Sequence, residues 1–177
     1  AAGPLKQKDS LGGLAVVSVA EAEVQEAARE RIKAVELGNS YSLETGDLVI
    51  AVGSPAGIVH SVKQGAVSYV AGNVQTADGQ TRVLYTDCGC ETGKGTFFLN
   101  MSGELVGWAT ELYGAEDRQG FTIALPVSEY KGNLQKLMNG IQIPYMGLKG
   151  QDVSEAMQAE GIPKGLYITE AIADSPA

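Results

Sequence analysis

Apolar residues along this chain fall in short runs, or alternate with polar residues, between clusters of glycine, serine and aspartate. Runs of this kind, bounded by turn residues, are typical of β-strands. Glycines 79 and 103 stand where tight hairpins require a positive φ. Six short strands at this spacing predict a small antiparallel barrel. The predicted strands are residues 48–52, 66–70, 83–85, 96–99, 105–109 and 121–125.

Outside the predicted barrel, three further segments have a clear pattern. Residues 14–19 form a β-branched run that predicts a strand. Residues 20–33 are rich in Ala, Glu and Arg and predict a short surface helix or helical turn with a solvated charged face. Residues 128–140 predict an amphipathic helix that ends at a glycine. Its side chains predicted to face inward are Leu134, Leu137 and Met138.

Length and charge limit the classes of partner. The 177 residues, 44% of them hydrophobic, suffice for one domain, or for one domain and part of another. With 21 acidic and 13 basic residues the net charge is -8, which disfavours nucleic acid and anionic membranes. No apolar run approaches the roughly 20 residues of a membrane helix, and the first residues lack a signal-peptide core. We therefore expect membrane attachment only through an anchor outside this chain, and no metal or cofactor.

Two cysteines are the first candidates for chemistry. Cys88 and Cys90 are separated by one glycine, so in an extended strand their side chains share a face. A bridge between such close residues would strain the backbone, which favours two free thiols that serve as packing residues. A reactive thiol would need a nearby base. The single histidine, His60, follows Pro55 in a glycine-rich turn, and nothing in the pattern places it beside the thiols.

Residues 86–108, TDCGCETGKGTFFLNMSGELVGW, resemble the nucleophile loop of the HtrA branch of trypsin-like serine proteases. That loop has Thr-Asp, five residues, Gly-x-Ser, an apolar strand and a Gly-Glu turn. The matching residues here are Thr86, Asp87, Gly93, Gly103 and Glu104. Gly95 stands at the serine position. Residues 46–57, 65–68 and 120–126 resemble other segments of the family's second barrel, so the resemblance covers most of the chain.

The resemblance implies a mainly β protein with a trypsin-like antiparallel β-barrel. Residues 1–40 would be the remnant of the first barrel plus a short helix, and residues 41–140 the complete second barrel with its closing helix. Residues 141–177 would be the first part of a PDZ domain, with a short helix over residues 153–160. The opening strand of that domain, which would bind peptide, is Tyr145, Met146, Gly147 and Leu148.

The same resemblance implies that the Ser/His/Asp triad is lost. Counting back from Ala15 places Gly13 at the aspartate position, and Asp9 is too far upstream to replace it. The family's histidine lies before the start of this chain, and His60 belongs to a surface loop. What remains is the oxyanion-hole backbone, whose N–H groups would be those of Gly93 and Gly95.

The resemblance therefore implies an HtrA-like pseudoprotease that binds peptides or unfolded proteins as added strands. One alternative is an active serine endopeptidase, if the full-length protein supplies a nucleophile and a base. Another is a structural homo-oligomer module. The family relation places the protein in the bacterial cell envelope or on the extracellular side.

Overall fold

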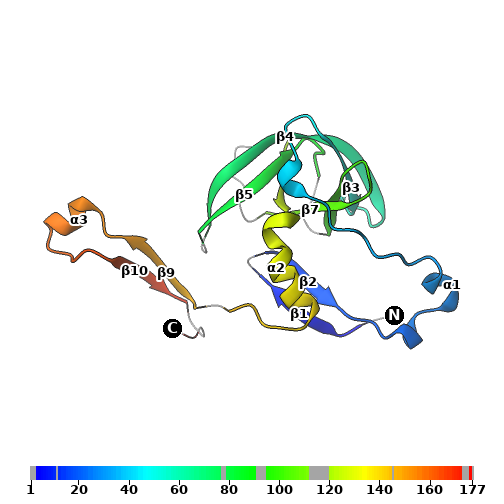
Figure 1. Ribbon diagram of the computed structural model, residues 1–177, viewed down its shortest axis with the longest axis horizontal. Helices are drawn as coiled ribbons and strands as arrows, with labels where there is room; N and C mark the ends of the chain where they lie inside the picture. Colours follow the sequence, from blue (N-terminus) through cyan, green and yellow to red (C-terminus); the bar gives the residue numbers. More distant parts are fainter. Residues whose placement is uncertain are drawn as a thin grey trace. The chain divides into compact units, whose positions relative to one another are not determined.

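The computed structural model describes residues 3–10, 12–76, 79–90, 95–111, 120–144, 146–172 and 176. The chain divides into two compact units, Ala1–Gln142 and Ile143–Ala177. Figure 1 shows the elements of both units in sequence colours. Within the described residues, no helix is long and apolar enough to cross a bilayer.

The first unit contains a closed six-stranded barrel in the order β3-β4-β5-β8-β7-β6, with every neighbouring pair antiparallel. Its strands are β3 (Leu48–Gly53), β4 (Ser61–Thr76), β5 (Gly79–Thr86), β6 (Thr96–Leu99), β7 (Leu105–Ala109) and β8 (Thr122–Pro126). The predicted barrel is confirmed, and β6 and β7 have the predicted bounds. Strands β4 and β5 are longer than predicted because their backbone ladder continues through polar residues as far as Thr76 and Gly79.

The barrel interior is one apolar cluster. It consists of Leu43, Val49, Ala51, Val67, Leu84, Cys88, Phe98, Val106, Ala109 and Ala124, with Val70 and Cys90 packed against it. Successive residues of a strand point to opposite faces, so the inward Val49 and Ala51 alternate with outward neighbours on β3. This packing confirms that both cysteines contribute to the core.

The outer face of β5, β7 and β8 carries a second apolar cluster. Its buried residues are Val83, Tyr85, Trp108, Ile123, Leu125 and Val127. The hairpin of β1 (Leu5–Asp9) and β2 (Leu14–Val17) contributes Leu14, and helix α2 (Val127–Met138) contributes Tyr130. The outer barrel wall is therefore a buried surface on this side.

Helix α2 buries one edge of its predicted apolar face. Leu137 is fully buried and Leu134 is half-buried, as predicted. The prediction that Met138 faces inward is wrong, because its side chain is 57% exposed. An α-helix turns by about 100° per residue, so Leu137 and Met138 cannot both point at the same surface.

Two hydrogen bonds hold the β1–β2 hairpin in place, and a ring contact joins the two side chains that donate them. The indole Nε1 of Trp108 donates a hydrogen bond to the backbone oxygen of Gly12 at 2.8 Å. The Trp108 ring meets the Tyr130 ring edge-on, with centroids 5.1 Å apart. The Tyr130 hydroxyl in turn donates to the Asp9 carboxylate. A side chain at Gly12 would collide with the Tyr130 hydroxyl, so the glycine permits this close approach.

The segment that leads from the hairpin to the barrel lies open to solvent. It contains a 3-10 turn, η1 (Glu21–Glu23), and one turn of helix, α1 (Glu26–Arg29). Both lie within residues 20–33, where a short surface helix or helical turn was predicted. Every side chain of these two elements is exposed or half-buried. The segment joins the barrel again where the Leu105 N–H donates to the Glu36 oxygen at 2.8 Å.

A lysine- and arginine-specific protease is therefore expected to cut this open segment first, at Arg29, Arg31 or Lys33, because exposed backbone with few contacts opens most readily. The released N-terminal fragment should stay bound through the hairpin contacts of Trp108 and Tyr130. Digestion followed by gel filtration and denaturing mass spectrometry measures this. Elution of the two fragments in separate fractions would contradict the expectation.

The outer face of β3, β4 and β6 is apolar and open to solvent. Val52 of β3 is paired with Val62 on one side and with Phe97 on the other. Leu48, Val62 and Phe97 are exposed in this part of the sheet. An antiparallel barrel that faces water normally presents polar residues on its outer surface. This surface is therefore a candidate contact face.

The second unit is a two-stranded antiparallel sheet with one short helix. Its elements are β9 (Leu148–Asp152), α3 (Glu155–Ala159) and β10 (Leu166–Ala171). Ser154 caps the helix by accepting a hydrogen bond from the Met157 N–H. Helix α3 lies within the range predicted for the short helix.

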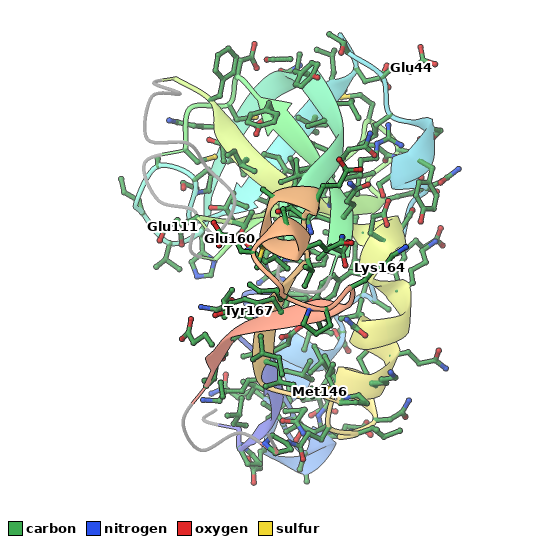
Figure 2. All side chains as sticks on the ribbon, turned by 90° about the vertical axis from the view of Figure 1, so that its left-hand side faces the viewer. Glu44, Glu111, Met146, Glu160, Lys164 and Tyr167 are labelled. Carbon is green, nitrogen blue, oxygen red and sulfur yellow. The ribbon has the colours of Figure 1, made fainter. Side chains whose placement is uncertain are left out.

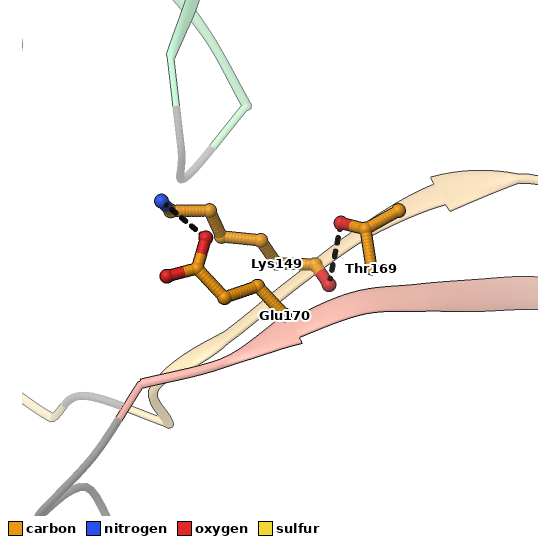
Figure 3. A network of polar contacts seen from close by, with 3 residues as sticks. All are labelled: Lys149, Thr169 and Glu170. Carbon is orange, nitrogen blue, oxygen red and sulfur yellow. Dashed lines mark hydrogen bonds and ion pairs between the residues drawn. The ribbon is translucent and has the colours of Figure 1, made fainter.

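Polar contacts join the two strands of this unit, and its apolar side chains are mostly open. Lys149 forms an ion pair with Glu170 at 2.8 Å, and the Thr169 hydroxyl donates to the Lys149 oxygen at 3.2 Å (Figure 3). Met146 and Tyr167, labelled in Figure 2, are exposed, whereas Val153 is buried. The unit therefore contains very little core of its own.

Candidate functional site

Gly95 lies directly before β6, at the end of the barrel where β3 stops at Gly53. We call this end the barrel mouth. The φ of Gly95 is 69°, in the left-handed region that favours glycine. Its carbonyl oxygen accepts a hydrogen bond from the Ser54 N–H at 3.1 Å. A Cβ built on Gly95 would lie 3.8 Å from the Ser54 Oγ, an ordinary contact distance. The position therefore has room for a small side chain. A residue other than glycine would, however, be strained at this left-handed φ.

Gly53 supports the Gly95 turn from the neighbouring strand. The last residue of β3, it has a φ of 110° and is paired with Thr96. A Cβ on Gly53 would lie 2.1 Å from the Gly95 oxygen. Two glycines are thus needed where β3 and β6 meet. Gly53 and Ser54 belong to the segment 46–57 that resembles the family. Their contacts with Gly95 could not be predicted, because they form only when β3 pairs with β6.

Thr96 carries an unusual buried hydroxyl. Its side chain is 1% exposed, and its Oγ1 has no hydrogen-bond partner among the residues that the structure describes. A buried polar atom without a partner costs about 1–3 kcal/mol of desolvation.

Replacing Thr96 with the isosteric valine should therefore raise the free energy of unfolding by about 1 kcal/mol, since it removes the buried hydroxyl without leaving a cavity. Urea unfolding followed by Trp108 fluorescence measures the change. The control is Thr122→Val, because the Thr122 hydroxyl accepts a hydrogen bond from the Cys90 N–H at 2.8 Å and its loss should destabilise. Equal losses of stability in both variants would contradict the conclusion that the Thr96 hydroxyl is buried without a hydrogen-bond partner among the described residues.

The connection that follows β5 is anchored to β4 and β8. The Ala66 N–H donates to the Asp87 carboxylate at 2.6 Å, and the Lys63 ammonium donates to the Gly89 oxygen at 2.7 Å. The Cys90 N–H is held by the Thr122 hydroxyl. These three bonds position the backbone on the approach to the Gly95 turn.

Neither cysteine lies in a strand, although the sequence argument compared their side chains as in an extended strand. Strand β5 ends at Thr86, and the chain turns at Asp87 and Cys88. Cys88 is 6% exposed and Cys90 is half-buried, and both thiols are free. Burial raises the pKa of the Cys88 thiol, although a hydrogen bond with Thr86 opposes the shift. Burial therefore disfavours the thiolate form of Cys88.

The position predicted for a catalytic aspartate, Gly13, lies in the turn between β1 and β2 with a φ of 65°. The preceding residue, Gly12, accepts the hydrogen bond from Trp108. Trp108 is paired with Phe97, two residues after Gly95. The hairpin turn and the β6 strand thus both contact Trp108.

His60 lies in the connection between β3 and β4, where its φ is 65° and its side chain is exposed. This confirms the prediction of a surface loop histidine. Gly93, the other predicted oxyanion-hole residue, lies outside the described residues. Among those that are described, no three His, Cys, Asp or Glu side chains are grouped as a metal site would require.

The predicted peptide-binding residues belong to the second unit. Tyr145 lies outside the described residues, and Met146 is exposed. Gly147 has a φ of 82° and accepts a hydrogen bond from the Ile172 N–H at 2.8 Å. Leu148 begins β9 and is paired with Ala171 on β10. Among the described residues, β9 is paired with β10 alone, which leaves its other edge without a strand partner there.

Comparison with known proteins identifies the family. The profile described as "Trypsin-like peptidase domain" matches residues 1–107. "Serine protease Do-like HtrA" of Bacillus subtilis is 33% identical over 96% of this chain and 40% of its own length. "Serine endoprotease DegS" of Haemophilus influenzae is 27% identical over 96% of this chain and 48% of its own. The chain thus spans less than half the length of these curated relatives.

A solved structure has the same fold. "HtrA-type protease AlgW with decapeptide" matches 99% of this chain and 54% of its own, with a TM-score of 0.63 at 20% identity. A barrel with this topology, together with the matching profile, defines a trypsin-like peptidase domain. The chain belongs to that family, in its HtrA-like branch.

Proposed function

We propose that this chain is an HtrA-like pseudoprotease that binds peptides or unfolded proteins without cleaving them. The proposal rests on Gly95, which the resemblance puts at the nucleophile position and whose backbone is left-handed. A glycine at this position has no hydroxyl of its own to attack a peptide bond. Gly13, which the resemblance puts at the aspartate position, and the exposed side chain of His60 support the same conclusion.

Two places suit an extended peptide. One is the barrel mouth at Gly95, where the family's oxyanion hole would offer backbone N–H groups. The other is the free edge of β9, which begins at Leu148 in the segment that resembles the opening strand of a PDZ domain. The related AlgW structure is named for a bound decapeptide, which supports peptide binding in this fold.

The test measures binding and hydrolysis on the same substrate. Fluorescein-labelled casein is titrated with the chain and followed by anisotropy, and release of labelled fragments is followed in parallel. We expect saturable binding without release. Cleavage by the unmodified chain would overturn the proposal, and so would the absence of any binding.

Gly95→Ser restores the hydroxyl. We expect this variant to fold with a loss of about 1–2 kcal/mol, because a side chain at a left-handed φ is strained. We also expect it to remain inactive, since the single histidine of the chain is exposed in the β3–β4 loop. The matched control is Gly103→Ser, where φ is 81° and nothing lies within 4 Å of the new Cβ. Hydrolysis by Gly95→Ser, but not by the unmodified chain or by Gly103→Ser, would favour the rival function. It would mean that the rest of an endopeptidase active site is still present.

A structural role in a homo-oligomer is favoured by a separate observation, the apolar outer face of β3, β4 and β6. Sedimentation velocity over a concentration series measures self-association. If this face joins copies, Val62→Lys should shift the equilibrium toward monomer, whereas Gln64→Lys on the same strand should have a smaller effect. A monomer at every concentration would exclude the oligomer.

The relatives also support a location. A protein of Pseudomonas savastanoi named "Probable periplasmic serine endoprotease DegP-like" is 30% identical over 80% of this chain and 31% of its own length. We infer that this protein acts in the bacterial cell envelope or on its outer side, where unfolded secreted proteins would be its partners.

A further inference from the structure

Cys88 and Cys90 form a thiol pair that the proposed peptide binding does not use. Cys88 belongs to the core cluster of the barrel, and Cys90 packs against the same cluster. One glycine separates them, and both side chains contact this one cluster. The pair lies in the connection between β5 and β6, the strands that flank the Gly95 turn.

The backbone between the two cysteines is bent. In an extended strand, residues two apart have Cα atoms about 6.6 Å apart, close to the upper limit of about 6.8 Å for a disulfide. Here the chain turns at Asp87 and Cys88, and Gly89 has a φ of 55°. A left-handed residue between two cysteines shortens the path between their Cα atoms. The strain expected for a strand therefore does not apply to this turn.

Three hydrogen bonds, two with β4 and one with β8, hold the turn in place. They come from Lys63 to the Gly89 oxygen, from Ala66 to the Asp87 carboxylate and from the Cys90 N–H to Thr122. None of them uses a sulfur atom. The turn is thus fixed by backbone and neighbouring side chains, while both thiols remain available to react with each other.

The two thiols differ in access. Cys90 is half-buried, whereas Cys88 is 6% exposed. Cys88 lies against β4, where a Cβ on Gly65 would come within 2.6 Å of its sulfur. An external reagent reaches Cys90 first, and Cys88 is placed to attack whatever forms on its neighbour.

The geometry points to a reversible dithiol–disulfide site at Cys88 and Cys90, oxidised by a low-molecular-weight disulfide. The Cys90 thiolate attacks one sulfur of the reagent, forms a mixed disulfide and releases one thiolate. The Cys88 thiolate then attacks the Cys90 sulfur, closes the Cys88–Cys90 bond and releases the second. The two protons lost by the cysteines end on the two released thiols, so two protein thiols are oxidised and one reagent disulfide is reduced.

The test uses the folded chain in mixtures of oxidised and reduced glutathione. Samples are quenched in acid, alkylated with N-ethylmaleimide and analysed by intact mass and peptide mapping. The expected product carries no alkyl group, lacks two hydrogen atoms and returns to two thiols when reduced glutathione is in excess. A lasting glutathione adduct, or two thiols that remain alkylatable throughout, would overturn the proposal.

Single-cysteine variants separate the two roles. Cys88→Ala should stop at the mixed disulfide, with glutathione held on Cys90. Cys90→Ala should react at least about tenfold more slowly, because Cys88 must first be exposed by local opening of about 1.4 kcal/mol or more. Equal reactivity of the two variants would contradict the assigned order. Because Cys88→Ala leaves a small cavity, circular dichroism checks its fold, and the wild-type product decides the main question in either case.

The second step should also depend on pH. Burial raises the pKa of the Cys88 thiol, so its thiolate fraction grows as the pH rises through the alkaline range. Closure of the mixed disulfide should accelerate accordingly. A closure rate that does not change with pH would contradict Cys88 as the attacking thiol.

Discussion

Replacing Trp108 with alanine is expected to lower the free energy of unfolding by about 3–5 kcal/mol, the usual cost of removing a large buried aromatic side chain. Trp108 is 3% exposed and lies between the barrel wall and helix α2. The change removes the edge-on contact with Tyr130 and the hydrogen bond to the Gly12 oxygen. Urea unfolding followed by circular dichroism measures the loss, because Trp108 is the single tryptophan of the chain.

Trp108→Phe is the matched control. It keeps most of the ring contact but removes the N–H donor, so we expect a loss of about 1–2 kcal/mol, mainly from the unpaired Gly12 oxygen. The hairpin should also loosen, which faster hydrogen exchange in β1 and β2 would report. If Trp108→Ala cost no more than Trp108→Phe, the docking of the hairpin would not depend on this side chain.

Gly53→Ala is expected to cost about 3 kcal/mol, the sum of backbone strain at a φ that L-residues rarely adopt and the loss of a hydrogen bond. The new Cβ would collide with the Gly95 oxygen, which must then move away from the Ser54 N–H. Because this shift falls on the Gly95 turn, binding of labelled casein at the barrel mouth should weaken as well. Thermal unfolding and anisotropy measure the two effects.

Gly72→Ala separates this local collision from the general effect of a Cβ on a strand. Gly72 lies on β4, and nothing is within 4 Å of the added atom. We expect a change in stability within about 0.5 kcal/mol. Similar losses in both variants would show that the contact between Gly53 and Gly95 is not the cause. Retained casein binding in Gly53→Ala would instead place the peptide on β9.

Local pattern predicted the barrel strands because their apolar runs are short and the turns between them are marked by glycine. Strands β6 and β7 were predicted to the residue, since a turn bounds each of them closely. The extension of β4 to Thr76 was missed, because polar residues carry ladder hydrogen bonds as well as apolar ones do. The orientation of Met138 was also missed, because apolar character alone does not say which of two adjacent helix residues meets the core.

The candidate site was only partly open to prediction. The assignment of Gly95 to the nucleophile position comes from the order of residues in its loop, and it stays a prediction. The supporting contacts from Gly53 and Ser54 come from a strand more than forty residues away, and they exist only after β3 and β6 pair. The turn at Cys88 was likewise hidden, because the residues around it carry no proline and the glycine between the cysteines suits a strand or a turn.

By itself, the sequence determined that this protein is mainly β and that its one histidine lies in a loop. These properties follow from residue identity and short-range periodicity, which act before the chain closes. Only the tertiary structure decided that Trp108 secures the hairpin through Gly12, that Gly53 supports Gly95, and that the two thiols share one bent turn. Those relations depend on strands distant in sequence meeting at a fixed register, which no local pattern specifies.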